Sequence, residues 1–221
     1  MMTKRLVHVM AFLMLTSMGV NAQKFSFGVF VDPQLTWFNS DTKRYDPNGP
    51  VAGFNIGFSG EKYFAQRYAL SSGLSLNTLG GNIRFMQDTF TLKTNDGEYT
   101  VTPQTNVKFR AQYLTLPVSL KFRSTQIGYT SFYANVGFKG SIRLKGFAWY
   151  SPQNVDREVA NDHFAWGFVS YFIGLGMEYS LGGESALQCG LSFSDGLTGM
   201  LDTSNGKITS QSLTLRLGII F

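Results

Sequence analysis

Few side chains in this sequence have the type and spacing that catalysis or metal binding requires. His163 follows a short acidic run, Asp156, Glu158 and Asp162, and a histidine beside a carboxylate could serve a hydrolase that also presented a serine. No serine adjoins His163 in a recognisable motif, so a solvated loop histidine is the simpler interpretation. After residue 22 the chain holds one histidine and one cysteine, too few for the usual metal sites. We therefore expect no catalytic, cofactor or metal site, with a His163 hydrolase as the remote alternative.

Four charged residues interrupt rows of Gly, Ser, Asn and Thr: Lys121, Lys139, Glu178 and Arg216. Each row alternates with apolar residues, and successive side chains of a strand point to opposite faces. If the polar rows line a narrow barrel, each charge needs a partner or water. We expect a structural ion network among Lys121, Glu178 and Arg216 towards one end of the barrel, with Lys139 nearer the other end. A gated ion path is the alternative.

The last ten residues, 212–221, show most clearly how such rows are arranged. Leu213, Leu215, Leu217, Ile219 and Phe221 fall on one face of a strand, opposite a mainly polar face. A transmembrane barrel strand is about ten residues long, apolar towards lipid and polar towards the lumen. The terminal Phe221 resembles the signature by which the barrel-assembly machinery recognises its substrates, so we expect it to be the C-terminal assembly signal. An edge strand of a soluble sandwich is the alternative.

The beginning of the chain predicts export. Lys4 and Arg5 precede an apolar run and Val20-Asn21-Ala22, the pattern of a signal peptide over residues 1–22. The mature domain is then 23–221, and losing Lys4 and Arg5 lowers the formal net charge from +5 to +3. A charge that small does not indicate nucleic-acid binding.

Eight alternating segments follow in the mature chain. We expect strands over residues 25–31, 52–59, 70–77, 112–122, 132–139, 169–180, 187–194 and 212–221. Their connections run long, short, long, short, long, short, long, as in bacterial barrels with long extracellular loops and short periplasmic turns. Asp32-Pro33 is expected to interrupt the first strand, and Pro117 to require a bulge or a local break in pairing. Within the long stretch 78–108, Asn95-Asp96-Gly97 predicts a hairpin that projects beyond the membrane.

Several motifs resemble the PorT-like family of small outer-membrane barrels. The segment QYLTLPVSLK at 112–121 is similar to a family motif, and so are Ile127-Gly128-Tyr129, Gly80-Gly81 and Asp32-Pro33-Gln34. The resemblance covers nearly all of the mature chain, and its motifs are structural. It implies a small barrel in the bacterial outer membrane, and its namesake is needed for protein export through the type IX secretion route.

Aromatic residues gather near the predicted strand ends, where amphipathic rings favour the headgroup level of a membrane. We expect girdle or loop-contact positions at Trp37, Tyr63, Tyr129, Trp149, Trp166 and Tyr179.

The sequence as a whole predicts an all-β, eight-stranded antiparallel up-and-down transmembrane barrel. Its partners are expected to be outer-membrane lipid, the barrel-assembly machinery during insertion and other envelope or secretion proteins. We expect a non-enzymatic accessory or interaction subunit of an envelope assembly, for secretion or outer-membrane biogenesis. A small pore is the alternative.

Overall fold

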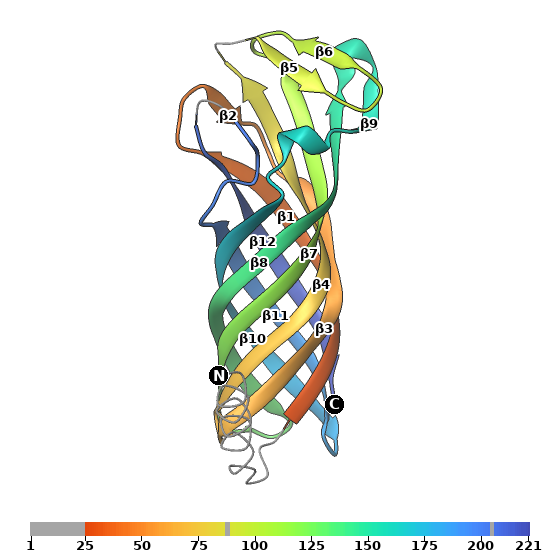
Figure 1. Ribbon diagram of the computed structural model, residues 1–221. Coiled ribbons are helices and arrows are strands. Elements are labelled where there is room, and N and C mark those ends of the chain that lie inside the picture. The colour runs from red at the N-terminus through yellow and green to blue at the C-terminus, as the bar shows by residue number, and fades with distance from the viewer. Residues whose placement is uncertain (1–24, 87–88, 204–205) are drawn as a thin grey trace, which may run out of the picture.

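The computed structural model describes residues 25–86, 89–203 and 206–221, so the predicted signal peptide lies outside the described residues. Eight long strands form a closed barrel (Figure 1). They are β1 (Phe25–Ser40), β3 (Val51–Ala65), β4 (Tyr68–Phe85), β7 (Asn106–Arg123), β8 (Thr130–Tyr150), β10 (Gly167–Gly182), β11 (Ser185–Gly196) and β12 (Ile208–Ile220). Each pairs antiparallel with its neighbours in this order, and β12 pairs with β1, which gives the predicted up-and-down topology.

The last strand closes the barrel against the first at the end where the chain stops. The amide nitrogen of Phe221 donates to the carbonyl oxygen of Phe27, and the amide of Phe27 donates back, both at 2.8 Å. Closure gives every barrel strand two neighbours, so no row of backbone N–H and C=O groups is left facing lipid.

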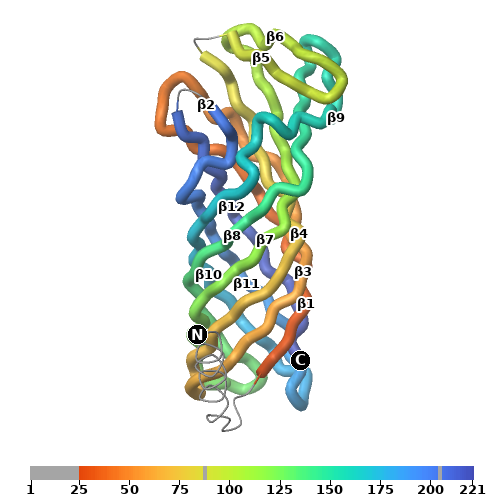
Figure 2. The backbone as a smooth tube through the Cα atoms, viewed as in Figure 1, coloured from red at the N-terminus to blue at the C-terminus, as the bar shows by residue number. Residues whose placement is uncertain are grey.

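The connections alternate as predicted between short turns at the end near the C-terminus and long segments at the other end. The long segments carry four short strands and two 3-10 helices: β2 (Tyr45–Pro47), β5 (Phe90–Lys93), β6 (Glu98–Val101), η1 (Ser151–Gln153), β9 (Val155–Val159) and η2 (Asn161–His163). Figure 2 shows β2, β5, β6 and β9 gathered at the end opposite the C-terminus. The β5–β6 pair is the hairpin expected around Asn95-Asp96-Gly97. Among the described residues, no helix is long and apolar enough to cross a membrane.

The apolar rows face outward along the part of the barrel nearer the short turns and the C-terminus. In β10, Leu175 is 65% exposed, whereas Phe172 and Glu178 on the alternate face are buried. The same alternation recurs in β12, where Leu213, Leu215 and Leu217 are exposed. An exposed apolar wall around a closed barrel is the pattern of a strand surface that faces acyl chains. The prediction that the Leu and Phe rows look away from the barrel axis is confirmed.

The strands are longer than predicted, because the alternation continues beyond the membrane with its sense reversed. The inward row of β7 changes from the polar residues Lys121, Ser119 and Thr115 to the apolar residues Tyr113, Ala111, Phe109 and Val107, all buried. Its outward row changes from Leu120 and Leu116 to Gln112, Arg110 and Lys108. Where lipid gives way to water the outside must be polar, and the interior can then be dry.

A hydrophobic core therefore fills the outer part of the barrel. It includes Phe38, Ile83, Leu92, Val101, Phe109, Tyr150, Phe164, Met200 and Ile208. Sequence analysis placed most of these positions in the long connections between strands and did not predict a hydrophobic core there. The residues come from barrel strands and from the hairpin and loop segments, so the core ties the loops to the barrel.

The two prolines in barrel strands interrupt pairing without ending a strand. Pro33 pairs with Phe54 of β3, but the β1–β12 register stops at Phe30↔Gly218 and resumes at Gln34↔Thr214. The prediction that Asp32-Pro33 interrupts the strand was wrong, because proline lacks one N–H and so loses pairing on one side only. At Pro117 the β4–β7 register skips two positions while β7–β8 pairing continues, which is the predicted local break.

Candidate functional site

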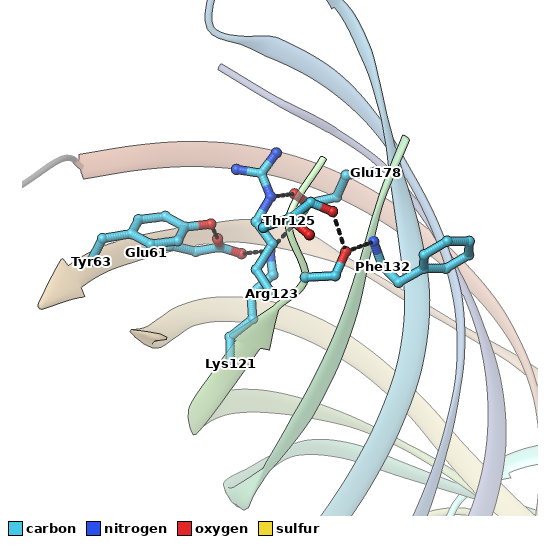
Figure 3. A network of polar contacts seen from close by, with 8 residues as sticks. Glu61, Tyr63, Lys121, Arg123, Thr125, Phe132 and Glu178 are labelled. Carbon is cyan, nitrogen blue, oxygen red and sulfur yellow. Dashed lines mark hydrogen bonds and ion pairs between the residues drawn. The ribbon is translucent and has the colours of Figure 1, made fainter. Parts of the chain in front are cut away.

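A buried ion network crosses the lumen near the periplasmic end (Figure 3). Lys121 of β7 lies between two carboxylates, 2.6 Å from Glu61 of β3 and in contact with Glu178 of β10. The three side chains are 2%, 6% and 3% exposed. Arg123 reaches the second oxygen of Glu178 at 3.0 Å. Two cations thus balance two carboxylates, which offsets the high cost of burying charge.

Tyr63 completes this network, which corrects its expected place in an aromatic girdle. Its hydroxyl donates to Oε2 of Glu61 at 3.1 Å. Tyr63 shares the inward parity of Glu61 in β3, because residues two apart lie on the same face of a strand. Glu61 was missed by sequence analysis, although the same parity from Asn55 and Gly57 through Ser59 identifies it as inward.

Arg216 lies in a second cluster, away from Glu178, so the expected three-residue network does not form. Its Nε donates to the carboxylate of Asp32 at 3.0 Å, and its guanidinium stacks 4.0 Å from the Phe30 ring. Asp32 is fully buried and also accepts from the Asn55 amide at 3.1 Å and from the Leu217 N–H at 3.4 Å. The carboxylate therefore occupies the gap that Pro33 leaves in the β1–β12 ladder.

A small polar cavity of about 40 Å³ lies beside this cluster. It is bordered by Asp32, Arg216, Tyr133 and Lys139, and the Lys139 ammonium sits 4.8 Å from the Phe172 ring. A cavity of this size holds a few water molecules at most. Tyr133 fills the lumen beneath it, since a Cβ on Gly176 would lie 2.5 Å from its ring.

Three successive levels of the lumen are thus filled. The ion network occupies the periplasmic end, and the hydrophobic core occupies the outer part. The middle is filled by the rings of Phe30, Tyr133 and Phe172. The interior of an eight-stranded barrel is just wide enough for side chains to fill it. Side chains thus occupy each of the three levels in the described part of the barrel, with the small cavity beside Asp32 and Arg216 between them.

His163 is buried, which corrects the expectation of a solvated loop histidine. It is 8% exposed and packs 4.9 Å from the Phe90 ring, and its Nε2 accepts the Lys93 N–H at 2.8 Å. The nitrogen that a general base would use is therefore already occupied. In the part of the chain that the structure describes, no three His, Cys, Asp or Glu side chains cluster as a metal site would require.

The burial of His163 predicts a pH-dependent contact. Desolvation lowers its pKa below the usual 6.5, opposed by the charge of Asp162. The folded state favours the neutral ring of His163. The contribution of this ring to the free energy of unfolding is therefore complete above pH 6.5, and it declines as the pH falls towards the lower pKa that His163 has in the folded state. The protection factors of the β5–β6 hairpin amides, which correct the exchange rates for their intrinsic pH dependence, should fall between pH 7.5 and pH 5. His163→Gln, which accepts the same bond without titrating, should remove this fall, and equal wild-type protection factors at both pH values would contradict the prediction.

The other expected girdle residues lie at both ends of the barrel. Tyr129 and Tyr179 are exposed near the C-terminal end, with ring centroids 6.0 Å apart. At the outer end Trp166 is 76% exposed, and Trp37 donates to Gln211 at 2.8 Å. Trp149 lies in β8 and not in a loop, beneath the Lys108 ammonium. Phe221 points outward, and its role in assembly stays a prediction.

The geometry agrees with a comparison against known protein families. The family described as "Outer membrane protein beta-barrel domain" matches residues 15–202, most of the chain. The chain belongs to this family. It is therefore a transmembrane barrel of the bacterial outer membrane, and the match does not distinguish a PorT-like member.

Solved structures with similarity to this barrel are also outer-membrane proteins. Neisserial surface protein A is 12% identical, with a TM-score of 0.49, and the match covers 88% of this chain and 95% of that one. OprG from Pseudomonas aeruginosa is 9% identical (TM-score 0.45; 90% and 95% covered). Ail of Yersinia pestis, in complex with the heparin analogue sucrose octasulfate, is 14% identical (TM-score 0.42; 90% and 99% covered). None of the curated proteins matches this chain.

Proposed function

We propose that this protein is a non-enzymatic interaction or accessory subunit of an envelope assembly and that it acts through its extracellular end. The observation that carries the proposal is the rigid attachment of the long loops to one another and to the barrel. A surface held in one conformation binds a partner with a smaller loss of conformational entropy.

Two sets of polar contacts hold the outer loops together. Glu158 of β9 accepts from Thr94 at 2.6 Å and from Tyr99 at 3.0 Å, and the Asn95 N–H donates to the Val159 carbonyl at 2.9 Å. These contacts fix the β5–β6 hairpin against β9. Below them, the Arg143 guanidinium donates to the carbonyl oxygens of Asn161 and Phe164. The hairpin and the 150–166 segment thus form one extracellular platform.

The PorT-like resemblance suggests where such a platform would be used. That family's namesake serves protein export, so we favour an assembly for secretion or outer-membrane biogenesis as the setting. The pore alternative is disfavoured by the filled lumen. The His163 hydrolase alternative is disfavoured because Nε2 of that residue is already an acceptor.

Co-purification in mild detergent from native membranes tests the interaction role. We expect a defined partner to accompany the wild type and to be lost when Thr94→Ala and Glu158→Ala free the hairpin. A matched double substitution in the periplasmic turn, Gln66→Ala with Arg67→Ala, should retain the partner. A barrel that is recovered alone at native expression levels, or a partner unaffected by the hairpin variant, would contradict the proposal.

A further inference from the structure

The outer wall of β7, β8 and β9 carries a basic patch above the apolar band. We define this basic patch by the side chains of Lys108, Arg110, Lys145 and Arg157. Strand pairing brings them together, because Lys108 pairs with Trp149, Arg110 with Phe147, and Gln112 with Lys145. β9 then pairs with β8 at Phe147↔Val159, which places Arg157 on the same wall.

Aromatic rings support three of the four cations. The Lys108 ammonium lies 4.9 Å from the Trp149 ring, and Lys145 and Arg157 lie 5.4 Å and 5.1 Å from the Phe147 ring. Arg157 does this at φ 55°, a left-handed conformation that residues other than glycine rarely adopt. Such strain persists only where surrounding contacts hold it. The surrounding contacts therefore hold the Arg157 guanidinium on this wall despite the backbone strain at that residue.

Ion pairing does not neutralise these cations. Within the described ranges, Lys108, Lys145 and Arg157 form no ion pair. Glu158, next to Arg157, is bonded to Thr94 and Tyr99 of the hairpin. Arg110 differs from the rest, because it donates to the Ala52 carbonyl oxygen at 2.5 Å. The basic patch thus keeps positive charge available to an anion from outside the chain.

The height of the basic patch identifies the kind of anion. Tilted barrel strands rise roughly 2.5 Å per residue along the membrane normal. Arg110 and Lys108 lie twelve and fourteen residues along β7 from Phe122 at the periplasmic end, which places them about 30–35 Å above it. The apolar band of such barrels is about 25 Å tall. The basic patch therefore stands at the headgroup level of the outer leaflet.

We propose that the basic patch binds the phosphate of an outer-leaflet lipid headgroup. Lys108, Lys145 and Arg157 would contact the phosphate, while the lipid's acyl chains would lie on the outward row of Ile142, Leu144 and Leu116 below them. The basic patch lies on the outer wall and shares one residue, Arg157 of β9, with the loop platform.

Lipid retention by the purified full-length barrel tests the proposal. Native mass spectrometry would count monophosphoryl lipid A and its dephosphorylated form bound after exchange into mild detergent. The test variant is Lys108→Gln, Lys145→Gln and Arg157→Gln. The control variant makes the same charge change outside the basic patch, with Lys62→Gln, Arg67→Gln and Lys93→Gln. Heat-modifiable migration on gels would verify that both variants fold.

Each cation near an anionic surface strengthens binding roughly fivefold, so losing three should weaken retention of the phosphorylated lipid about a hundredfold. The control variant should bind like the wild type, and the dephosphorylated lipid should bind weakly to all three proteins. Equal binding of both lipids, equal loss in the control variant, or displacement of the lipid by soluble inositol hexaphosphate would overturn the proposal. The last result would indicate a site for a soluble anion.

Discussion

Lys121→Met is expected to destabilise the barrel by about 3–5 kcal/mol, the cost typical of removing one partner from a buried ion pair. The substitution keeps most of the side-chain volume but leaves Glu61 and Glu178 buried with only Arg123 to balance them. Urea unfolding of the barrel in lipid vesicles would measure the loss. Lys62→Met, on the outside of β3, should change the unfolding free energy by less than about 1 kcal/mol.

A second substitution separates charge imbalance from lost packing. Adding Glu61→Gln to Lys121→Met leaves one buried carboxylate, Glu178, beside one guanidinium, Arg123. The buried charges then balance again, so most of the stability should return. If the double variant is as unstable as Lys121→Met alone, the network does not act through charge balance. A Lys121→Met barrel of wild-type stability would contradict the ion-network account directly.

Asp32→Ala should loosen the contact between the first and last strands. It removes the acceptor for Arg216 and for the Leu217 N–H at the gap in the β1–β12 ladder. We expect a loss of about 2–3 kcal/mol, below the value for a fully buried pair, because the Arg216 side chain keeps 26% exposure. Amide exchange should rise in β1 and β12 around this gap and stay unchanged in β7 and β8.

Substituting Arg216, the ion-pair partner of Asp32, provides the control for the contact between β1 and β12. Asp32→Ala combined with Arg216→Met removes the unpaired cation and should be more stable than Asp32→Ala alone. Uniform exchange changes around the barrel, or none near Leu217, would show that Asp32 has no special role in closure.

The membrane-facing part of the fold could be predicted from the sequence, because the lipid boundary imposes a strict period of two. Rows such as Leu213, Leu215 and Leu217 identify the outward face without any knowledge of neighbouring strands. The order of short and long connections then fixes which end is outside. The number of strands, their topology and the outward faces all follow from these two local signals.

The clusters inside the barrel could not be predicted in the same way. Pairing of Arg216 with Asp32 depends on the stagger between β1 and β12, which alternation does not specify. The outer core was missed because Tyr113, Phe109 and Val107 continue an inward row whose polarity reverses above the membrane. Alternation with the opposite sense just beyond an apolar band is the signal that would have revealed it.

Current through single barrels in planar lipid bilayers tests the central claim most directly. The account holds that the lumen is filled from the ion network to the outer core, so that the protein works through its exposed surfaces. It predicts no conductance steps for the folded wild-type barrel across a range of voltages. Reproducible steps of defined size from the folded wild type would show that an aqueous path exists and would contradict the account.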